Sequence, residues 1–125
     1  MSNFASKIRD MITLSAYTLS RNETIETGKS VSEAFFVIKN ETWDSDDDAV
    51  LSKHITTVAS PDGQITDDGA TSHHAVFYFK LEEADTELLS PYLPYQFGIK
   101  LKISGDYIVT ETGQIFPLPG VVEAE

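Results

Sequence analysis

The 125-residue chain contains no cysteine. Disulfide bonds, zinc sites built on thiolates and cysteine nucleophiles are therefore excluded. Long apolar runs are missing as well, because hydrophobic stretches reach only a few residues, and the sequence predicts no segment that spans a bilayer. Residues 1–10 lack the apolar core of a secretory signal, so we expect a protein that is made and kept in the cytoplasm.

Basic residues are scarce. Nine lysines and arginines stand against 20 aspartates and glutamates, which gives a formal net charge of −11 and a pI near 4.5. An acidic surface repels phosphate groups, so neither nucleic acid nor an anionic membrane is an expected partner. Hydrophobic residues make up 41% of the chain, a globular composition. We predict a single domain over residues 1–125, with 1–10 and 121–125 loose.

Signatures of catalysis are missing too. The chain has no G-x-S-x-G elbow and no H-E-x-x-H zinc motif. Residues 28–30 carry the Gly-Lys-Ser end of a phosphate-binding loop, but Glu23 stands where its first glycine belongs. His73 and His74 are adjacent, and neighbours in a strand point to opposite faces, so the pair does not suit one metal ion. The sequence predicts a protein that is not an enzyme and has no catalytic residue, cofactor or metal.

The acidic segment 44–48 matches part of the ligand spacing of a calcium-binding loop. Asp44, Asp46 and Asp48 have the spacing of the first three calcium ligands, but Ala49 and Ile55 replace the glycine and the bidentate glutamate. We interpret the segment as a solvated loop, with a weak calcium site of another geometry as the alternative.

The clearest structural signal is an alternation near the C-terminus. Tyr95, Phe97, Ile99, Leu101 and Ile103 occupy every second position, with polar residues or glycine between them. Successive side chains of a strand point to opposite faces, so this segment predicts a strand with one face on a core. The segment 31–39 carries apolar residues on both faces, which indicates a central strand that is covered twice.

Similar patterns predict the other elements. We expect further strands at 12–19, 49–59, 64–66, 74–81, 107–111 and 114–116, a helical turn within 82–89, and an extension of the alternating strand back to residue 92. The segments 12–19 and 114–116 are the expected sheet edges. The predicted fold is all-β: an immunoglobulin-like antiparallel β-sandwich of about seven strands with one short helical turn. The predicted core contains either Phe36 and Ile38 or Phe35 and Val37, together with Phe77, Phe79, Phe97, Ile99 and Leu101.

Aromatic residues supply the candidate contacts. Trp43 is the only tryptophan and stands in the acidic loop. An exposed aromatic ring there could stack on a sugar or insert into a partner, whereas a ring folded back would cover one end of the sandwich. Trp43, Tyr92 and Tyr95 are the candidate residues for contact with a partner or ligand.

One set of residues resembles a known module. The pattern consists of Thr27-Gly28, Leu81, Ala84-Asp85-Thr86, Leu88, Tyr95, Phe97, Ile99, Leu101, Gly105, Thr110, Gly113 and Ile115. It is similar to a β-sandwich module of tailed bacteriophages and prophages, in particular the N-terminal domain of baseplate upper proteins and related small neck or tail proteins. The chain departs from that pattern at Leu93-Pro94, where the family has a glycine turn, and in the long acidic region 40–60.

The resemblance implies a non-enzymatic structural component of a phage or prophage virion (tail, neck or baseplate) that acts through protein–protein assembly. Its implied partners are other virion proteins and, in a ring, further copies of itself. Its implied location is the cytoplasm of the bacterial host during assembly and then the virion. The alternative is a carbohydrate- or ligand-binding β-sandwich module that uses Trp43 and the nearby tyrosines.

Overall fold

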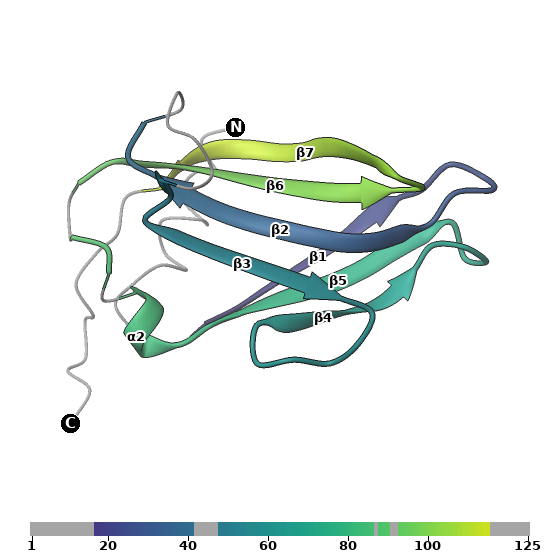
Figure 1. The fold of residues 1–125 in the computed structure, drawn as a ribbon, viewed down its shortest axis with the longest axis horizontal. Helices are drawn as coiled ribbons and strands as arrows, with labels where there is room; N and C mark the ends of the chain where they lie inside the picture. The colour runs from purple at the N-terminus through teal and green to yellow at the C-terminus, as the bar shows by residue number, and fades with distance from the viewer. Residues whose placement is uncertain (1–16, 42–47, 87, 91–92, 116–125) are drawn as a thin grey trace.

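Seven strands and one helical turn make up the regular structure of the residues that the computed structural model describes, which are 17–41, 48–86, 88–90 and 93–115 (Figure 1). In chain order the elements are β1 (Tyr17–Thr24), β2 (Val31–Lys39), β3 (Leu51–Thr56), β4 (Gly63–Asp68), β5 (His74–Leu81), α2 (Glu83–Thr86), β6 (Tyr95–Ile103) and β7 (Asp106–Ile115). The terminal segments that we expected to be loose lie outside the described residues.

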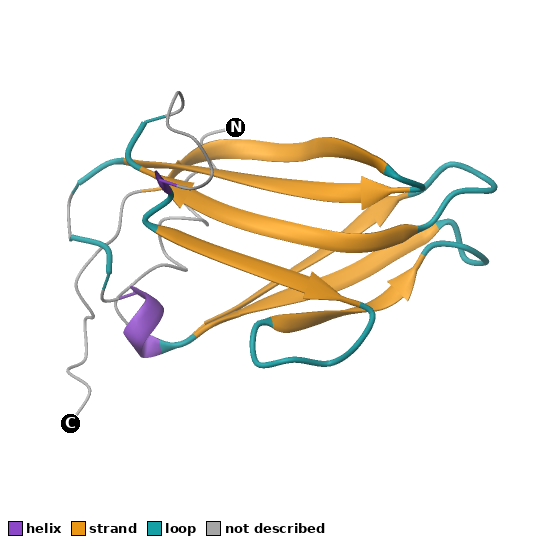
Figure 2. Cartoon of the chain, viewed as in Figure 1, coloured by secondary structure: helices purple, strands orange, loops and turns teal. Residues whose placement is uncertain are grey.

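The strands form two antiparallel sheets that pack face to face (Figure 2). The three-stranded sheet has the order β1-β5-β4, and the four-stranded sheet has the order β3-β2-β6-β7. These orders correspond to strands B-E-D and C′-C-F-G of an immunoglobulin-type sandwich. The predicted all-β sandwich with one short helical turn is confirmed.

Phenylalanine rings fill the space between the sheets. Phe36 of β2 packs against Phe79 of β5 and Phe97 of β6, with ring centroids 5.6 and 6.2 Å apart. Phe77 meets Phe79 edge-on at 5.8 Å. All four rings are buried, which confirms the predicted core and selects Phe36 and Ile38 as the inward pair of β2. Alternation along each strand is what brings these rings to one side.

The strand with apolar residues on both faces, β2, is central as predicted, but in the described chain only one of its faces is covered. β2 lies between β3 and β6, yet Phe35 and Val37 on its outer face are only partly buried by the described residues. The expectation that this strand is covered twice is therefore wrong for the described chain. The reason is that the second sheet packs on only one face of the four-stranded sheet.

Two strand boundaries also differ from the sequence prediction. Residues 107–111 and 114–116 were expected as separate strands with a turn at Gly113, but β7 runs unbroken to Ile115 and pairs with β6 along its length. Gly113 lies directly against Phe97, whose Cε1 would be 2.5 Å from an added Cβ. The glycine therefore makes room for a buried ring rather than a turn. The predicted hairpin turn between β6 and β7 is confirmed. Ser104 and Gly105 have the positive φ angles of a type I′ turn, 49° and 94°.

The other edge strand extends further than predicted. The polar segment after Leu19 continues β1 to Thr24, paired with β5. Arg21 of β1 points toward the sandwich interior. The fold accommodates this charge because the guanidinium donates two hydrogen bonds, 2.7 and 2.9 Å long, to the Glu111 carboxylate of β7. This paired contact joins the edge strands of the two sheets. β1 and β7 are both sheet edges, as expected for the parts of 12–19 and 114–116 that are described.

The opposite edge of the sandwich is joined in the same manner. Lys53 of β3 points inward beside Phe36 and is 8% exposed. Its ammonium lies 2.7 Å from Asp85 of α2 and 3.4 Å from Asp62, just before β4. Burial opposes the charge on Lys53, but these two carboxylates outweigh it and raise the pKa of Lys53 above its ordinary 10.5.

A single tyrosine fixes the connection between β5 and β6. Tyr95 begins β6, is 4% exposed, and accepts a hydrogen bond of 2.8 Å from the backbone N–H of Ser90. A tyrosine at this place in an immunoglobulin-type sandwich, bonded to the backbone a few residues upstream, is a tyrosine corner. This bond ties Ser90 to the buried ring of Tyr95.

Replacing Tyr95 by Phe should destabilise the fold by about 1 kcal/mol, because the ring still fills the core while the bond to Ser90 is lost. The free energy of unfolding in urea measures this. The matched control is Tyr107→Phe, which removes a hydroxyl from a side chain that is 57% exposed and should change little. Equal losses of stability from the two substitutions would contradict a stabilising role for the tyrosine corner.

Acid should weaken the Lys53 contact through Asp85. Burial opposes the charged form of Asp85, but hydrogen bonds from Lys53 and the Glu82 N–H outweigh it and lower the pKa of Asp85 below its ordinary 3.8. Its contribution to stability is therefore complete above that value and lost as the pH falls through the lower, folded-state pKa.

Asp85→Asn should lower stability at neutral pH by about 1–3 kcal/mol and flatten the loss of stability below pH 4, since a charged hydrogen-bond acceptor is gone. Urea unfolding at a series of pH values measures both effects. Asp106→Asn, at the exposed first position of β7, is the control and should leave the profile unchanged. An unaltered acid limb in Asp85→Asn would contradict this assignment.

Candidate functional site

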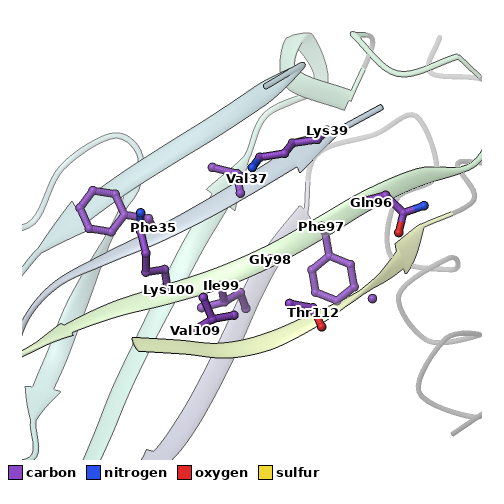
Figure 3. A pocket seen from close by; sticks show the side chains of 11 residues that line it. Phe35, Val37, Lys39, Gln96, Phe97, Gly98, Ile99, Lys100, Val109 and Thr112 are labelled. Carbon is purple, nitrogen blue, oxygen red and sulfur yellow. The ribbon is translucent and has the colours of Figure 1, made fainter. Parts of the chain in front are cut away.

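The outer face of the four-stranded sheet is the most distinctive surface in the described part of the chain. A depression of about 430 Å³ lies across β2, β6 and β7 (Figure 3). Its apolar lining includes Phe35, Val37 and Val109, and lysine side chains border it. We call this surface the lysine–aromatic face; it consists of Glu33, Phe35, Val37, Lys39, His54, Gly98, Lys100, Lys102, Tyr107 and Val109.

A glycine in the middle of β6 hollows this face. Gly98 pairs with Val37 on one side and Thr112 on the other, so it lies at the centre of the outward row. An added Cβ would meet nothing closer than 3.7 Å, which is ordinary contact. The fold therefore does not require glycine at this position. A glycine inside a strand often marks a place where another chain or ligand approaches closely.

Two lysines and two aromatic rings form the polar end of the depression. The Lys100 ammonium lies 5.2 Å from the ring centroids of both Phe35 and Tyr107, and Lys102 lies 5.4 Å from the Tyr107 ring. Figure 3 shows the Lys100 side chain running from β6 toward Phe35. Cation–π attraction holds the ammonium groups at the surface in defined positions.

The carboxylate of Glu33 completes this end. His54 Nε2 lies 2.6 Å from Glu33 Oε1, and the imidazole stacks on Phe35 with centroids 4.7 Å apart. The hydrogen bond from His54 and the charge of Lys102 lower the pKa of Glu33 below its ordinary 4.5. Glu33 is therefore ionised at neutral pH and orders the side chains around it.

The apolar character continues onto the edge strand. Tyr107, Ile108 and Val109 follow one another in β7 and are 57%, 45% and 60% exposed. Just beyond them the pairing of β6 and β7 shifts between Ile99 and Lys100, a β-bulge. Three consecutive exposed apolar residues are unusual in a soluble domain unless they serve contact with another molecule. Bulges are common on edge strands, where they discourage uncontrolled pairing.

The candidate residues from the sequence do not assemble into this site. Trp43 and Tyr92 lie outside the described residues, and Tyr95 lies in the core as the tyrosine corner. Sequence reasoning missed the lysine–aromatic face. Two signals could have found it: the apolar residues on both faces of 31–39, and the run from Tyr107 to Val109.

Chemistry at other places in the described chain is structural. Lys53, Asp62 and Asp85 join the sheets, and Asp67 is held in a turn by the Ser72 hydroxyl and the Gly69 N–H. No group of three or more histidines or acids in residues 17–41, 48–86, 88–90 and 93–115 is placed to hold a metal ion. None of the helices in the same ranges is long and apolar enough to cross a membrane.

Comparison with known proteins identifies no relative. No family model matches the chain, and searches of curated proteins and of solved structures find no match either.

Gly98→Ala should raise stability by about 0.5–1 kcal/mol, because the added methyl group has room and alanine loses less backbone freedom on folding than glycine. Gly113→Ala is the contrasting variant and should destabilise, since its Cβ would strike Phe97. Urea unfolding of both variants tests whether Gly98 is free of a role in the fold. A marked loss of stability in Gly98→Ala would show that it is not.

Proposed function

We propose that this protein is a non-enzymatic structural component of a bacteriophage or prophage virion, in the tail, neck or baseplate, and that it acts through protein–protein assembly. Its partners are other virion proteins and further copies of itself. The observation that carries the assembly role is the lysine–aromatic face with the exposed residues Tyr107 and Val109 along its edge. The phage setting rests on the sequence pattern between residues 27 and 115.

The composition of the face supports a protein partner. The depression lies on the outer face of a sheet and is lined by side chains of β2, β6 and β7 (Figure 3). Protein interfaces combine an apolar centre, aromatic residues and a polar rim. Val37, Gly98 and Val109 form such a centre, with lysines at its rim.

The carbohydrate-binding alternative has less support. It relied on Trp43 and Tyr92, which lie outside the described residues, and on Tyr95, which is buried. The lysine–aromatic face does contain Tyr107, but charged lysines flank that ring at 5.2 and 5.4 Å.

Incorporation into particles tests the proposal. A tagged copy is expressed in a host in which the phage or prophage that encodes the protein is induced, and purified virions are examined by mass spectrometry. We expect the wild-type chain in the particles. Gly98→Leu, which fills the depression, should reduce incorporation at least tenfold, whereas Lys80→Glu on the other sheet should not.

Fold must be verified separately for each variant by its unfolding transition, so that loss of incorporation reports on the face. Absence of the wild-type chain from purified particles would end the virion proposal. Normal incorporation of Gly98→Leu would leave a virion protein whose docking surface lies elsewhere.

A further inference from the structure

We propose that the lysine–aromatic face binds the acidic surface of a second copy of this chain, in a head-to-tail contact. The inference rests on the proposed assembly function and names the partner of the face. The contact pairs two different surfaces, the lysine–aromatic face of one copy and the acidic rim of the three-stranded sheet of the next. We define the acidic rim by Asp62, Asp67, Asp68 and Glu82, which lie at the two ends of β4 and just after β5. Asp62 also binds Lys53, and Asp67 also accepts bonds from Ser72 and Gly69.

Charge separates the two surfaces. The whole chain has a formal net charge of −11, yet the lysine–aromatic face carries three lysines against one glutamate. The rest of the chain is therefore even more acidic than its net charge indicates. The acidic rim belongs to β4 and to the residues that flank it and β5, all on the other sheet. Complementary charge selects partners and orients them.

The same charges disfavour a symmetric pair. In a two-fold contact the same patch lies on both sides, so Lys100 and Lys102 of one copy would lie near their equivalents in the other. Like charges facing each other oppose association. A contact between unlike surfaces avoids this, and such contacts generate closed rings or open filaments instead of stopping at two copies.

The side chains of Lys100 and Lys102 are already held in place, which reduces the side-chain entropy that they lose when a carboxylate binds. Lys100 is held between Phe35 and Tyr107, and Lys102 is held by Tyr107 and by Glu33 at 3.5 Å. An immobilised lysine loses less rotamer freedom when a carboxylate docks onto it. The hollow at Gly98 and the exposed Val109 then supply apolar contact beside the charged pairs.

Sedimentation velocity across a concentration series tests the contact. We expect the wild-type chain to form species larger than a dimer as its concentration rises, because head-to-tail contact does not stop at two. Lys100→Glu/Lys102→Glu should abolish these species. The control Lys29→Glu/Lys80→Glu makes the same change in net charge outside the face. Because Lys80 adjoins Asp62, this control makes the acidic rim more acidic, so association should weaken at most slightly.

A charge exchange tests the second surface. Asp68→Lys/Glu82→Lys should also lose self-association. In a mixture with Lys100→Glu/Lys102→Glu, the reversed face of one variant is complementary to the reversed rim of the other, and the remaining native face is complementary to the remaining native rim. The mixture should therefore contain assemblies in which the two variants alternate and which neither variant forms alone. Gly98→Leu, which keeps every charge, should weaken wild-type association at least tenfold and guards against misfolding of the charge variants.

Each contrary outcome has a distinct meaning. A wild-type chain that stays monomeric at all concentrations overturns the self-contact, while particle incorporation still decides the virion role. A species that stops at two copies overturns the head-to-tail arrangement. Equal loss in the two lysine double variants would assign the effect to net charge and overturn the role of the face, and mixed variants that do not associate would overturn the acidic rim.

Discussion

The fold depends on the burial of phenylalanine rings between the two sheets. Phe36, Phe79 and Phe97 come from three strands and meet in one cluster. Each large buried side chain contributes roughly 1.5–3 kcal/mol by leaving water. Because a strand alternates its side chains, committing these rings to the interior also decides which residues point outward. The outer face follows from the core.

Polar contacts close the two long edges of the sandwich. The four-stranded and three-stranded sheets expose their interior along two long edges, and a charged pair joins the sheets at each: Arg21 with Glu111, and Lys53 with Asp62 and Asp85. Breaking a partly buried pair leaves an uncompensated charge, so such pairs penalise wrong arrangements more than they add stability. Together with the tyrosine corner, they specify this packing of the sheets among others that would bury the same rings.

The lysine–aromatic face takes no part in either task. Its glycine has room for a side chain, and its apolar residues on β7 are mostly exposed. A surface that neither fills the core nor closes an edge is open to selection for contact with other molecules. The placement of lysines there, in a chain with more than twice as many acids as bases, gives the surface a chemical identity that the rest of the molecule lacks. Its charge and its hollow are the features through which we connect the fold to assembly.

The sequence by itself determined a central strand of each sheet, because alternation is a local property: 31–39 and 74–81 were placed correctly, as were the Ser104-Gly105 turn and the phenylalanine core. Other features depended on contacts that only the folded chain makes. Gly113 lies in a strand because Phe97 occupies the space beside it, and Arg21 is tolerated inward because Glu111 lies across the edge. The Tyr95 hydroxyl accepts a hydrogen bond from the Ser90 N–H. Only the tertiary structure decided which face of β2 the second sheet covers, since its sequence is apolar on both, and this left the candidate site on the uncovered one.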